Sequence, residues 1–227
     1  MHESTRVLAL KRDGTAWTAE TDGGSVTASV VVLAANTFAR DLGYLKPFVM
    51  AVYTYAGFTR VLTPSEIATL GSDDVWGISP TFHYGTTMRR LADGRLLLRS
   101  LYSYESEMGE ASVRKGLSRS LAAHFPQLGD TEFEFAWAGI IAITHGKAPF
   151  AGKVGEGLYA MSGCNGSGIG KFSLIGKYMA EEIAGQHRLA GIAAAFGEPK
   201  WMPPDPFRYV GYKVASTVGK ALAGKDI

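Results

Sequence analysis

The spacing of glycines between two predicted elements constrains the fold of this chain more than any other feature. In the segment LYAMSGCNGSGIGKFSLIGKYMAEEIAG, the apolar run Leu158 to Met161 predicts a buried strand. A glycine-rich loop follows, and then a helix is predicted because apolar residues recur at three- and four-residue intervals, at Ile175, Tyr178, Met179, Ile183 and Ala184. A glycine loop that opens a helix lets the backbone approach a ligand, since glycine has no Cβ and the first helical turn has free N–H donors. The segment therefore predicts a cofactor site.

Spacing tests two standard forms of such a loop. A phosphate-binding P-loop needs glycine five residues before the Gly-Lys pair and Ser or Thr after it. Here Asn165 and Phe172 occupy those positions. The dinucleotide fingerprint G-x-G-x-x-G also fails, because Gly166, Gly168 and Gly170 alternate. A nicotinamide-binding reductase is therefore a weak alternative, and a glycine turn that only packs helix against sheet remains another.

Composition excludes several classes of protein. The 227 residues are 46% hydrophobic, which is enough for a sizeable core, and the formal charge of +2 comes from scattered Lys and Arg. This balance argues against nucleic acid as a partner. The single cysteine, Cys164, excludes an internal disulfide, and the five histidines show no metal-ligand spacing, so we expect no metal site. We expect no signal peptide and no membrane span, and hence a cytoplasmic protein.

The elements predict a chain of mixed class, α/β plus α+β. Hairpin turns at Asp13-Gly14 and Asp22 to Gly24 predict antiparallel strands from Val7 to Thr27. The valine-rich run Ala28 to Asn36 predicts one strand covered on both faces, as in a parallel sheet, ending where a ligand can approach. Alternating segments between Pro47 and Phe150 predict a mostly antiparallel sheet around one helix, Ala111 to His124. A Pro-rich linker then leads to an amphipathic helix, Tyr209 to Ala223.

Four stretches, in order, resemble the carboxyl-terminal half of the FAD-dependent amine and amino-acid oxidoreductases, the D-amino-acid oxidase/glycine oxidase superfamily. They are GGSVTASVVVLAANTFA, DGRLLLRS, FPQLGDTEFEFAWAGIIAITHGKAPFAGKV and the glycine loop with its helix. The resemblance implies a partial FAD/NAD(P)-binding Rossmann-like layer interleaved with an antiparallel substrate sheet. It divides the chain into residues 1–46 and 150–190 (FAD-binding remainder), 47–149 (substrate domain) and 191–227 (linker and terminal helix).

The same resemblance implies FAD as cofactor and oxidation of a C–N bond of an amine or amino acid by hydride transfer to the flavin N5. The glycine loop then stabilises negative charge on the reduced ring, helped by the helix amino terminus. The implied cofactor-binding residues are Ala35, Asn36, Trp137, Gly163, Gly166, Ser167, Gly168, Ile169, Gly170 and Lys171. Aromatic walls of the substrate pocket are expected from Tyr53, Tyr55, His83 and Tyr102. No residue is assigned as catalytic, because this chemistry needs mainly orientation and desolvation.

One difference between this sequence and the family pattern concerns the substrate. In many amino-acid-oxidising relatives the segment after W-x-G carries an arginine followed by proline, and a nearby arginine holds the substrate carboxylate. Here the position of that first arginine is Ile141. With the PDPFRYVGYKVA tail, this pattern looks closest to the gamma-glutamylputrescine oxidoreductase branch, whose substrates present an amine. The alternative is that Arg99 or Arg89 binds the carboxylate.

A second departure concerns the ADP half of FAD. Family members open with strand, G-x-G-x-x-G and helix, whereas this sequence enters directly at the predicted hairpin. We therefore expect weak FAD retention by the chain alone. It is either part of a flavoenzyme completed by a second chain that supplies the amino-terminal half, or a truncated, non-catalytic remnant.

Overall fold

Turn residues divide the start of the chain into an antiparallel meander, as predicted. The computed structural model describes residues 1–224. Strands β1 (Val7–Asp13), β2 (Ala16–Thr21) and β3 (Gly24–Ala28) form one three-stranded sheet in that order. Gly14 and Gly24 both have positive φ, at 58° and 142°, a backbone conformation that favours glycine at these two turns. The predicted hairpins are confirmed.

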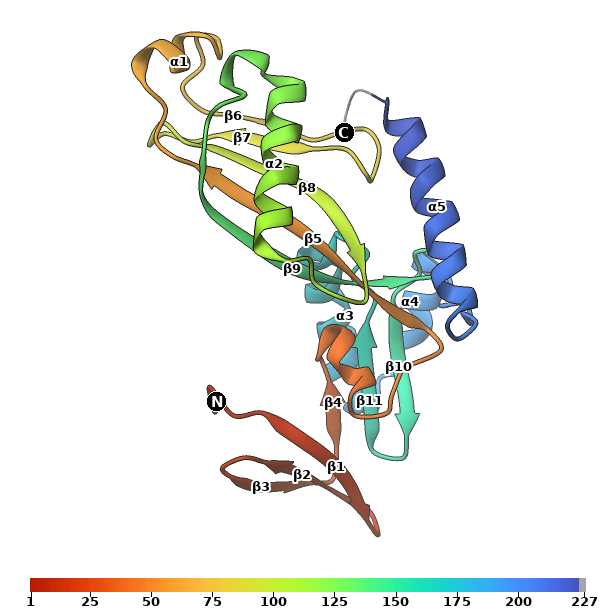
Figure 1. Cartoon of the computed structure of the whole chain (residues 1–227). Helices are drawn as coiled ribbons and strands as arrows, with labels where there is room; N and C mark the ends of the chain where they lie inside the picture. Colours follow the sequence, from red (N-terminus) through yellow and green to blue (C-terminus); the bar gives the residue numbers. More distant parts are fainter. Residues whose placement is uncertain (225–227) are drawn as a thin grey trace. The chain divides into compact units, whose positions relative to one another are not determined.

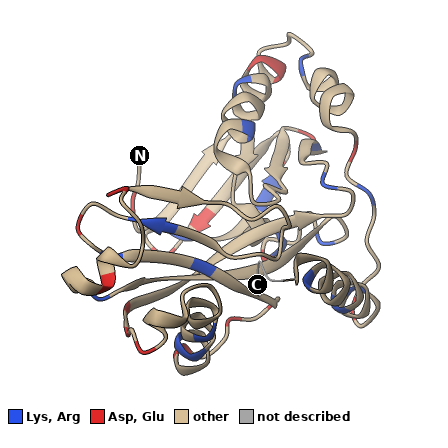
Figure 2. Ribbon diagram, turned by 90° about the horizontal axis from the view of Figure 1, so that it is seen from above, with Lys and Arg blue, Asp and Glu red and all other residues tan. Residues whose placement is uncertain are grey.

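The chain divides into two compact units, and each is described by itself. Unit 1 comprises Met1–Ala51 and Ile141–Pro203, and unit 2 comprises Val52–Ile140 and Pro204–Ile227. Figure 1 shows the elements of both. Basic and acidic positions are spread along the ribbon (Figure 2), in agreement with the scattered charges of the sequence.

Unit 1 contains the parallel strand pair that the sequence predicts. Strand β11 (Leu158–Ser162) lies between antiparallel β10 (Phe150–Gly155) and parallel β4 (Val31–Leu33). A short 3-10 helix η1 (Asn36–Arg40) follows β4, and α3 (Gly168–Ile183) follows β11. The core is apolar and includes Trp17, Leu33, Val49 and Leu158. The Trp17 indole N–H donates to the Glu156 carbonyl at 2.8 Å, which ties the meander to this sheet.

The prediction of one doubly covered strand over Ala28 to Asn36 is wrong. The run is divided between the end of β3 and a β4 of only three residues, Val31–Leu33. Leu33 faces the core, whereas Val30 and Val32 are 37% and 39% exposed. Within residues 1–224, therefore, only one face of β4 is packed. An apolar composition does not show whether a strand is covered on one face or on both, which is why the prediction failed.

Unit 2 is built on a five-stranded sheet in the order β6-β7-β8-β5-β9. The strands are β5 (Val49–Thr59), β6 (Trp76–Ile78), β7 (Thr87–Arg90), β8 (Leu96–Tyr104) and β9 (Phe133–Thr144), and the β5–β8, β6–β7 and β7–β8 pairs are antiparallel. Helix α2 (Glu110–His124) covers one face through Val113, Leu117 and Leu121. It ends before Phe125 and the 3-10 helix η2 (Pro126–Leu128), so the predicted helix and its stop are confirmed. The terminal helix is also confirmed, as α5 (Phe207–Ala223).

Two helices were not expected. Helix α1 (Pro64–Ala68) begins with a capping box, in which Thr63 and Glu66 bond each other's backbone N–H and Pro64 occupies the first turn. The sequence Thr63-Pro64-Ser65-Glu66 is typical of a capping box with proline in the first helical turn, so this helix start could have been predicted. Arg60 binds the Glu66 carboxylate with both guanidinium nitrogens, and this lowers the pKa of Glu66 to about 2. Helix α4 (Leu189–Phe196) occupies the stretch before the Pro-rich segment and contacts α3.

Gly57 in β5 is required by close packing. A Cβ there would lie 2.7 Å from both a Phe133 ring carbon and the Phe135 carbonyl oxygen. We predict that Gly57→Ala lowers the free energy of unfolding by about 1–3 kcal/mol, because backbone cannot move aside as a flexible side chain can. Urea unfolding followed by tryptophan fluorescence measures the change. Gly77→Ala on β6 is the matched control, since its Cβ would make only an ordinary 3.5 Å contact with Arg89, and equal losses would contradict the argument.

Candidate functional site

The parallel pairing of β4 and β11 brings several predicted cofactor residues to one edge of the unit 1 sheet. Val31 pairs with Leu158 and Leu33 with Ala160, so both strands end on the same side. Asn36 follows β4 with φ of 51°, and the Ser162 hydroxyl donates to its carbonyl oxygen at 2.9 Å. In α/β sheets, ligands bind outside the carboxyl ends of the strands. Ala35, Asn36 and Gly163 therefore share the edge where a cofactor is expected.

Two loop glycines are needed for different reasons. Gly163 has φ of 83°, and a Cβ on it would lie 2.4 Å from the Thr144 methyl carbon, so both conformation and packing require glycine. Gly166 has φ of 80°, but nothing lies within 4 Å of its Cβ position. At Gly166, conformation alone requires glycine, and the space beside it is open.

Asn165 fixes the conformation of the loop, although it is not among the predicted cofactor-binding residues. Its side-chain nitrogen donates to the carbonyls of Lys147 and Gly163 at 3.0 and 2.8 Å and to the Thr144 hydroxyl at 3.0 Å. Its side-chain oxygen accepts from the Thr144 N–H at 3.0 Å, and its own N–H donates to Ala142. Its φ is 51°, a left-handed conformation that asparagine tolerates. The sequence feature that could have identified Asn165 is an asparagine between two glycines, a pattern typical of a turn held by the asparagine side chain.

The start of α3 presents open donors. No side chain caps the helix at Ser167, and Ile169 in the first turn is 93% exposed. Nothing lies within 4 Å of a Cβ built on Gly170. Open space therefore lies beside Ile169 and Gly170 in the first turn of α3, and a helix amino terminus favours negative charge there. Such a terminus fits the N1/O2 edge of a flavin ring, which becomes negative on reduction.

Lys171 and Cys164 lie within the same loop. The Lys171 ammonium is 3.4 Å from the Cys164 carbonyl oxygen and 5.8 Å from the Phe196 ring centre on α4. Lys171 therefore braces the loop against α4, and its role at a flavin edge stays a prediction. Cys164 is half-buried and has a free thiol. If Gly168 had a Cβ, that atom would lie only 3.0 Å from the Cβ of Cys164, so Cys164 packs closely against the start of α3 as a small residue.

In unit 2 the predicted substrate residues fall into two groups. Tyr53 and Tyr55 pack with the core between the sheet and α2. The Tyr55 side chain is 1% exposed, and its hydroxyl oxygen accepts from the Met108 N–H at 2.7 Å and bonds the Ser103 hydroxyl at 2.6 Å. Trp137 lies on the opposite face, because its β9 neighbours Ala136 and Ala138 pack in that core. Its ring centre is 5.1 Å from that of Phe58.

Tyr102 and His83 do lie together, beside Arg99. The Tyr102 hydroxyl donates to the His83 carbonyl at 2.7 Å and accepts from the Arg99 guanidinium. Tyr102 also meets Tyr84 edge-on, with ring centres 5.3 Å apart, and burial raises the pKa of Tyr84. The structure therefore connects Tyr102 and His83 through a polar cluster that neither Tyr53 nor Tyr55 joins.

Arg99 is the charged centre of that cluster. It lies on β8 between the buried residues Leu98 and Ser100, so it faces away from α2. Its guanidinium bonds the Thr87 hydroxyl at 3.2 and 2.8 Å and reaches the Thr54 hydroxyl and the Gly85 carbonyl at 3.5 Å. Every one of these acceptors is neutral, and within residues 1–224 no Asp or Glu pairs with it. Arg99 is thus a half-buried cation without a counter-ion among the described residues, whereas Arg89 is simply exposed on β7.

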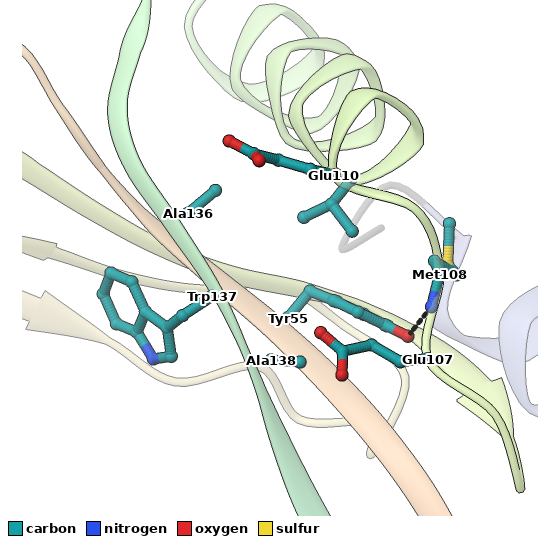
Figure 3. Close-up of a pocket in the computed structure, with 8 residues that line it drawn as sticks. Tyr55, Glu107, Met108, Glu110, Ala136, Trp137 and Ala138 are labelled. Carbon is teal, nitrogen blue, oxygen red and sulfur yellow. Dashed lines mark hydrogen bonds between the residues drawn. The ribbon is translucent and has the colours of Figure 1, made fainter.

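A shallow pocket lies on the α2 side of the unit 2 sheet (Figure 3). It measures about 140 Å³ and is lined by Tyr55, Glu107, Met108, Glu110, Val113, Ala136, Trp137 and Ala138. The Trp137 indole points away from Tyr55 and the two glutamates. Ligand pockets usually measure about 300–1,000 Å³. The hollow is too small to serve as a substrate chamber.

A glycine loop at the carboxyl edge of a parallel strand pair, together with an antiparallel sheet backed by one helix, defines the fold of the FAD-dependent oxidases. Comparison with solved structures supports this fold. Fructosamine oxidase (Amadoriase II) from Aspergillus fumigatus superimposes with a TM-score of 0.64 at 18% identity, over 84% of this chain and 50% of the other. Glycine oxidase from Geobacillus kaustophilus gives 0.57 at 23% identity, over 71% of this chain and 43% of the other.

The family follows from sequence. The model of the FAD dependent oxidoreductase family (DAO) matches residues 1–182, so the chain belongs to that family. Probable oxidoreductase OrdL from Rhizobium meliloti is 28% identical over 190 residues, which cover 82% of this chain. The chain spans 43% of the length of that relative. Among the helices of residues 1–224, none combines the length and the hydropathy that a transmembrane segment needs.

The hydrogen bonds of Asn165 generate a test of the loop. We predict that Asn165→Ala lowers the free energy of unfolding by about 1–3 kcal/mol, because it leaves backbone groups near Thr144 and Lys147 without partners. Amide hydrogen exchange across residues 163–167 should also become faster. Ser167→Ala is the control, since Ser167 makes no side-chain cap. Unchanged exchange in Asn165→Ala would show that the loop is held by other contacts.

Proposed function

We propose that this chain supplies the flavin-ring contacts and the substrate contacts of an FAD-dependent oxidoreductase that oxidises a C–N bond of an amine or amino acid. The observation that carries the proposal is the open α3 amino terminus at the carboxyl edge of β4 and β11, in a chain that belongs to the FAD-dependent oxidoreductase family. The names of glycine oxidase and fructosamine oxidase point to amino-acid or amine substrates.

The division of labour follows from the side chains. When bound, FAD would supply the acceptor for a hydride from the carbon next to the amine nitrogen. The N–H groups of Gly168, Ile169 and Gly170 stabilise negative charge at the ring edge, and Asn165 keeps the loop rigid so that little reorganisation is needed. Lys171 holds the loop against α4. No acid–base residue is required beyond those that orient a neutral amine.

Arg99 supplies the anion-binding part of the proposal. Ile141 stands where many relatives carry an arginine, whereas Arg99 on β8 has only neutral partners within residues 1–224. A guanidinium held by threonine hydroxyls is preorganised to bind a carboxylate. We therefore propose a substrate with an oxidisable amine and a carboxylate or other anionic group, a description that a gamma-glutamyl amine satisfies.

The ADP half of FAD needs residues that this sequence does not contain. No G-x-G-x-x-G occurs in the 227 residues, and the chain spans 43% of its OrdL relative. We propose that an amino-terminal FAD-binding half, in the same polypeptide or in a second chain, completes the cofactor site. The alternative is a remnant without catalytic activity. Coding sequence for G-x-G-x-x-G directly upstream would favour the enzyme.

The charge preference of the α3 terminus can be tested with Gly170→Glu. An acidic residue in the first helical turn favours the helix, so the variant should fold, but its carboxylate opposes negative charge on the flavin. We predict flavin reduction by amine about 10–100 times slower in the assembled enzyme. Loss of oxidised flavin absorbance measures the rate.

Ala180→Glu is the matched control, because it adds the same charge to an exposed position about 15 Å further along α3. Equal rates in the two variants would contradict the assigned role of the terminus. Tight, stoichiometric FAD in the purified 227-residue chain alone would contradict the need for a completing half.

Arg99→Met tests the substrate class. We predict a KM about 10–100 times higher for amines that carry a carboxylate and little change for amines without one, since one charge-assisted contact is lost. Steady-state kinetics on matched substrate pairs gives the comparison. Arg99→Lys should recover part of the loss, and Arg89→Met, which removes an exposed arginine of β7, should have no effect. A uniform rise in KM for both substrate classes would assign Arg99 a structural role instead.

A further inference from the structure

Helix α5 has an apolar face that no other described residue covers. Phe207, Val210, Val214, Val218 and Leu222 recur at three- and four-residue intervals and lie on one side of the helix. They are 70%, 56%, 60%, 53% and 62% exposed, respectively. Monomeric soluble domains rarely leave such a continuous apolar stripe open unless it binds something. The helix has 17 residues and is about 25 Å long.

The opposite face of α5 explains how the helix is held. Tyr212, Ser216 and Ala223 are buried, and a Cβ on Gly219 would lie 2.4 Å from the Tyr84 ring. The Tyr104 ring centre is 5.1 Å from that of Tyr212, and burial raises the pKa of Tyr212 to about 12. The inner face therefore anchors α5 to unit 2, and the apolar stripe is not a face left open by poor packing.

The start of α5 is fixed as well. The Asp205 carboxylate accepts from the Tyr104 hydroxyl at 2.7 Å and from the Tyr209 N–H at 3.1 Å. The first turn is thus tied to β8, within the unit that also contains the Arg99 cluster (Figure 1). A preformed helix loses little conformational entropy when it docks.

The charges on α5 indicate what the stripe contacts. Between Phe207 and Ala223 the charged residues are Arg208, Lys213 and Lys220, with no Asp or Glu. Lys213 and Lys220 lie two turns apart on one flank of the stripe, and the Lys213 ammonium is 5.3 Å from the Tyr209 ring centre. Neither lysine makes an ion pair within residues 1–224. An apolar stripe bordered only by cations complements a surface that is apolar inside and anionic outside.

We propose that α5 is a peripheral docking surface for anionic phospholipid, lying in the plane of the membrane with its valine stripe toward the acyl chains and its lysines at the headgroups. Long basic side chains reach headgroups while their stems cover apolar surface. A second copy of this chain is a poorer occupant, because two such helices would bring cations together without acids between them. The proposal is independent of the flavin chemistry.

Vesicle binding by the purified full chain is the test. We expect sedimentation with phosphatidylcholine vesicles that contain phosphatidylglycerol to be at least about ten times stronger than with phosphatidylcholine alone, and weaker at high salt. Val214→Glu with Val218→Glu should reduce binding to anionic vesicles at least about tenfold, since it places two carboxylates at the stripe. Lys213→Gln with Lys220→Gln should remove most of the preference for anionic lipid.

Val61→Glu with Val75→Glu is the matched control, because both valines are exposed in unit 2, at 50% and 61%, and the charge change is the same. Circular dichroism verifies the fold of each variant. Absence of binding to anionic vesicles, or equal loss in the control, would overturn the proposal. Concentration-dependent self-association that disappears only in Val214→Glu with Val218→Glu would assign the stripe to a second copy instead.

Discussion

Parallel pairing of β4 with β11 is the constraint on which the unit 1 site depends. It joins residues 31–33 to residues 158–160, so segments far apart in sequence end at one sheet edge. Because both strands run the same way, η1 and the glycine loop leave from the same side. At this edge the Ser162 hydroxyl donates to the Asn36 carbonyl, which connects the ends of the two strands. The Trp17 indole N–H donates to the Glu156 carbonyl and so connects the meander to the same sheet. Without this pairing, the glycines would form an ordinary turn with no neighbouring strand end.

The loop shows how rigidity and openness are combined. Asn165 directs its side-chain bonds to Thr144, Lys147 and Gly163, so the backbone is held from within unit 1. The α3 amino terminus, by contrast, has no side-chain cap and carries the highly exposed Ile169. A site that stabilises developing negative charge needs hydrogen-bond donors that are already in position and have no other acceptor. Arg99 follows the same principle in unit 2, since neutral oxygens orient its guanidinium without neutralising it.

Much of the local structure was predictable, because turns and periodicity are short-range. Asp-Gly pairs predicted the meander, and apolar spacing predicted α2, α3 and α5. The length of β4 was not predictable, since composition does not reveal whether a neighbouring element covers both faces. Nor could periodicity separate Tyr53 and Tyr55 from Tyr102. They are aromatic residues of the same predicted sheet, but strand alternation and a bulge between Thr54 and Tyr55 turn them to different surroundings.

The sequence by itself determined the family, through the order of its segments, and it predicted where a cofactor loop would lie, because closely spaced glycines mark backbone that adopts special conformations or packs closely. Tertiary structure decided the surroundings of each candidate residue. It placed Tyr55 in the core, gave Asn165 the hydrogen bonds that hold the loop, and left Arg99 with neutral partners only among residues 1–224. It also showed that one face of α5 is anchored while the apolar stripe stays open. These outcomes depend on which distant residues become neighbours, and no local pattern encodes that choice.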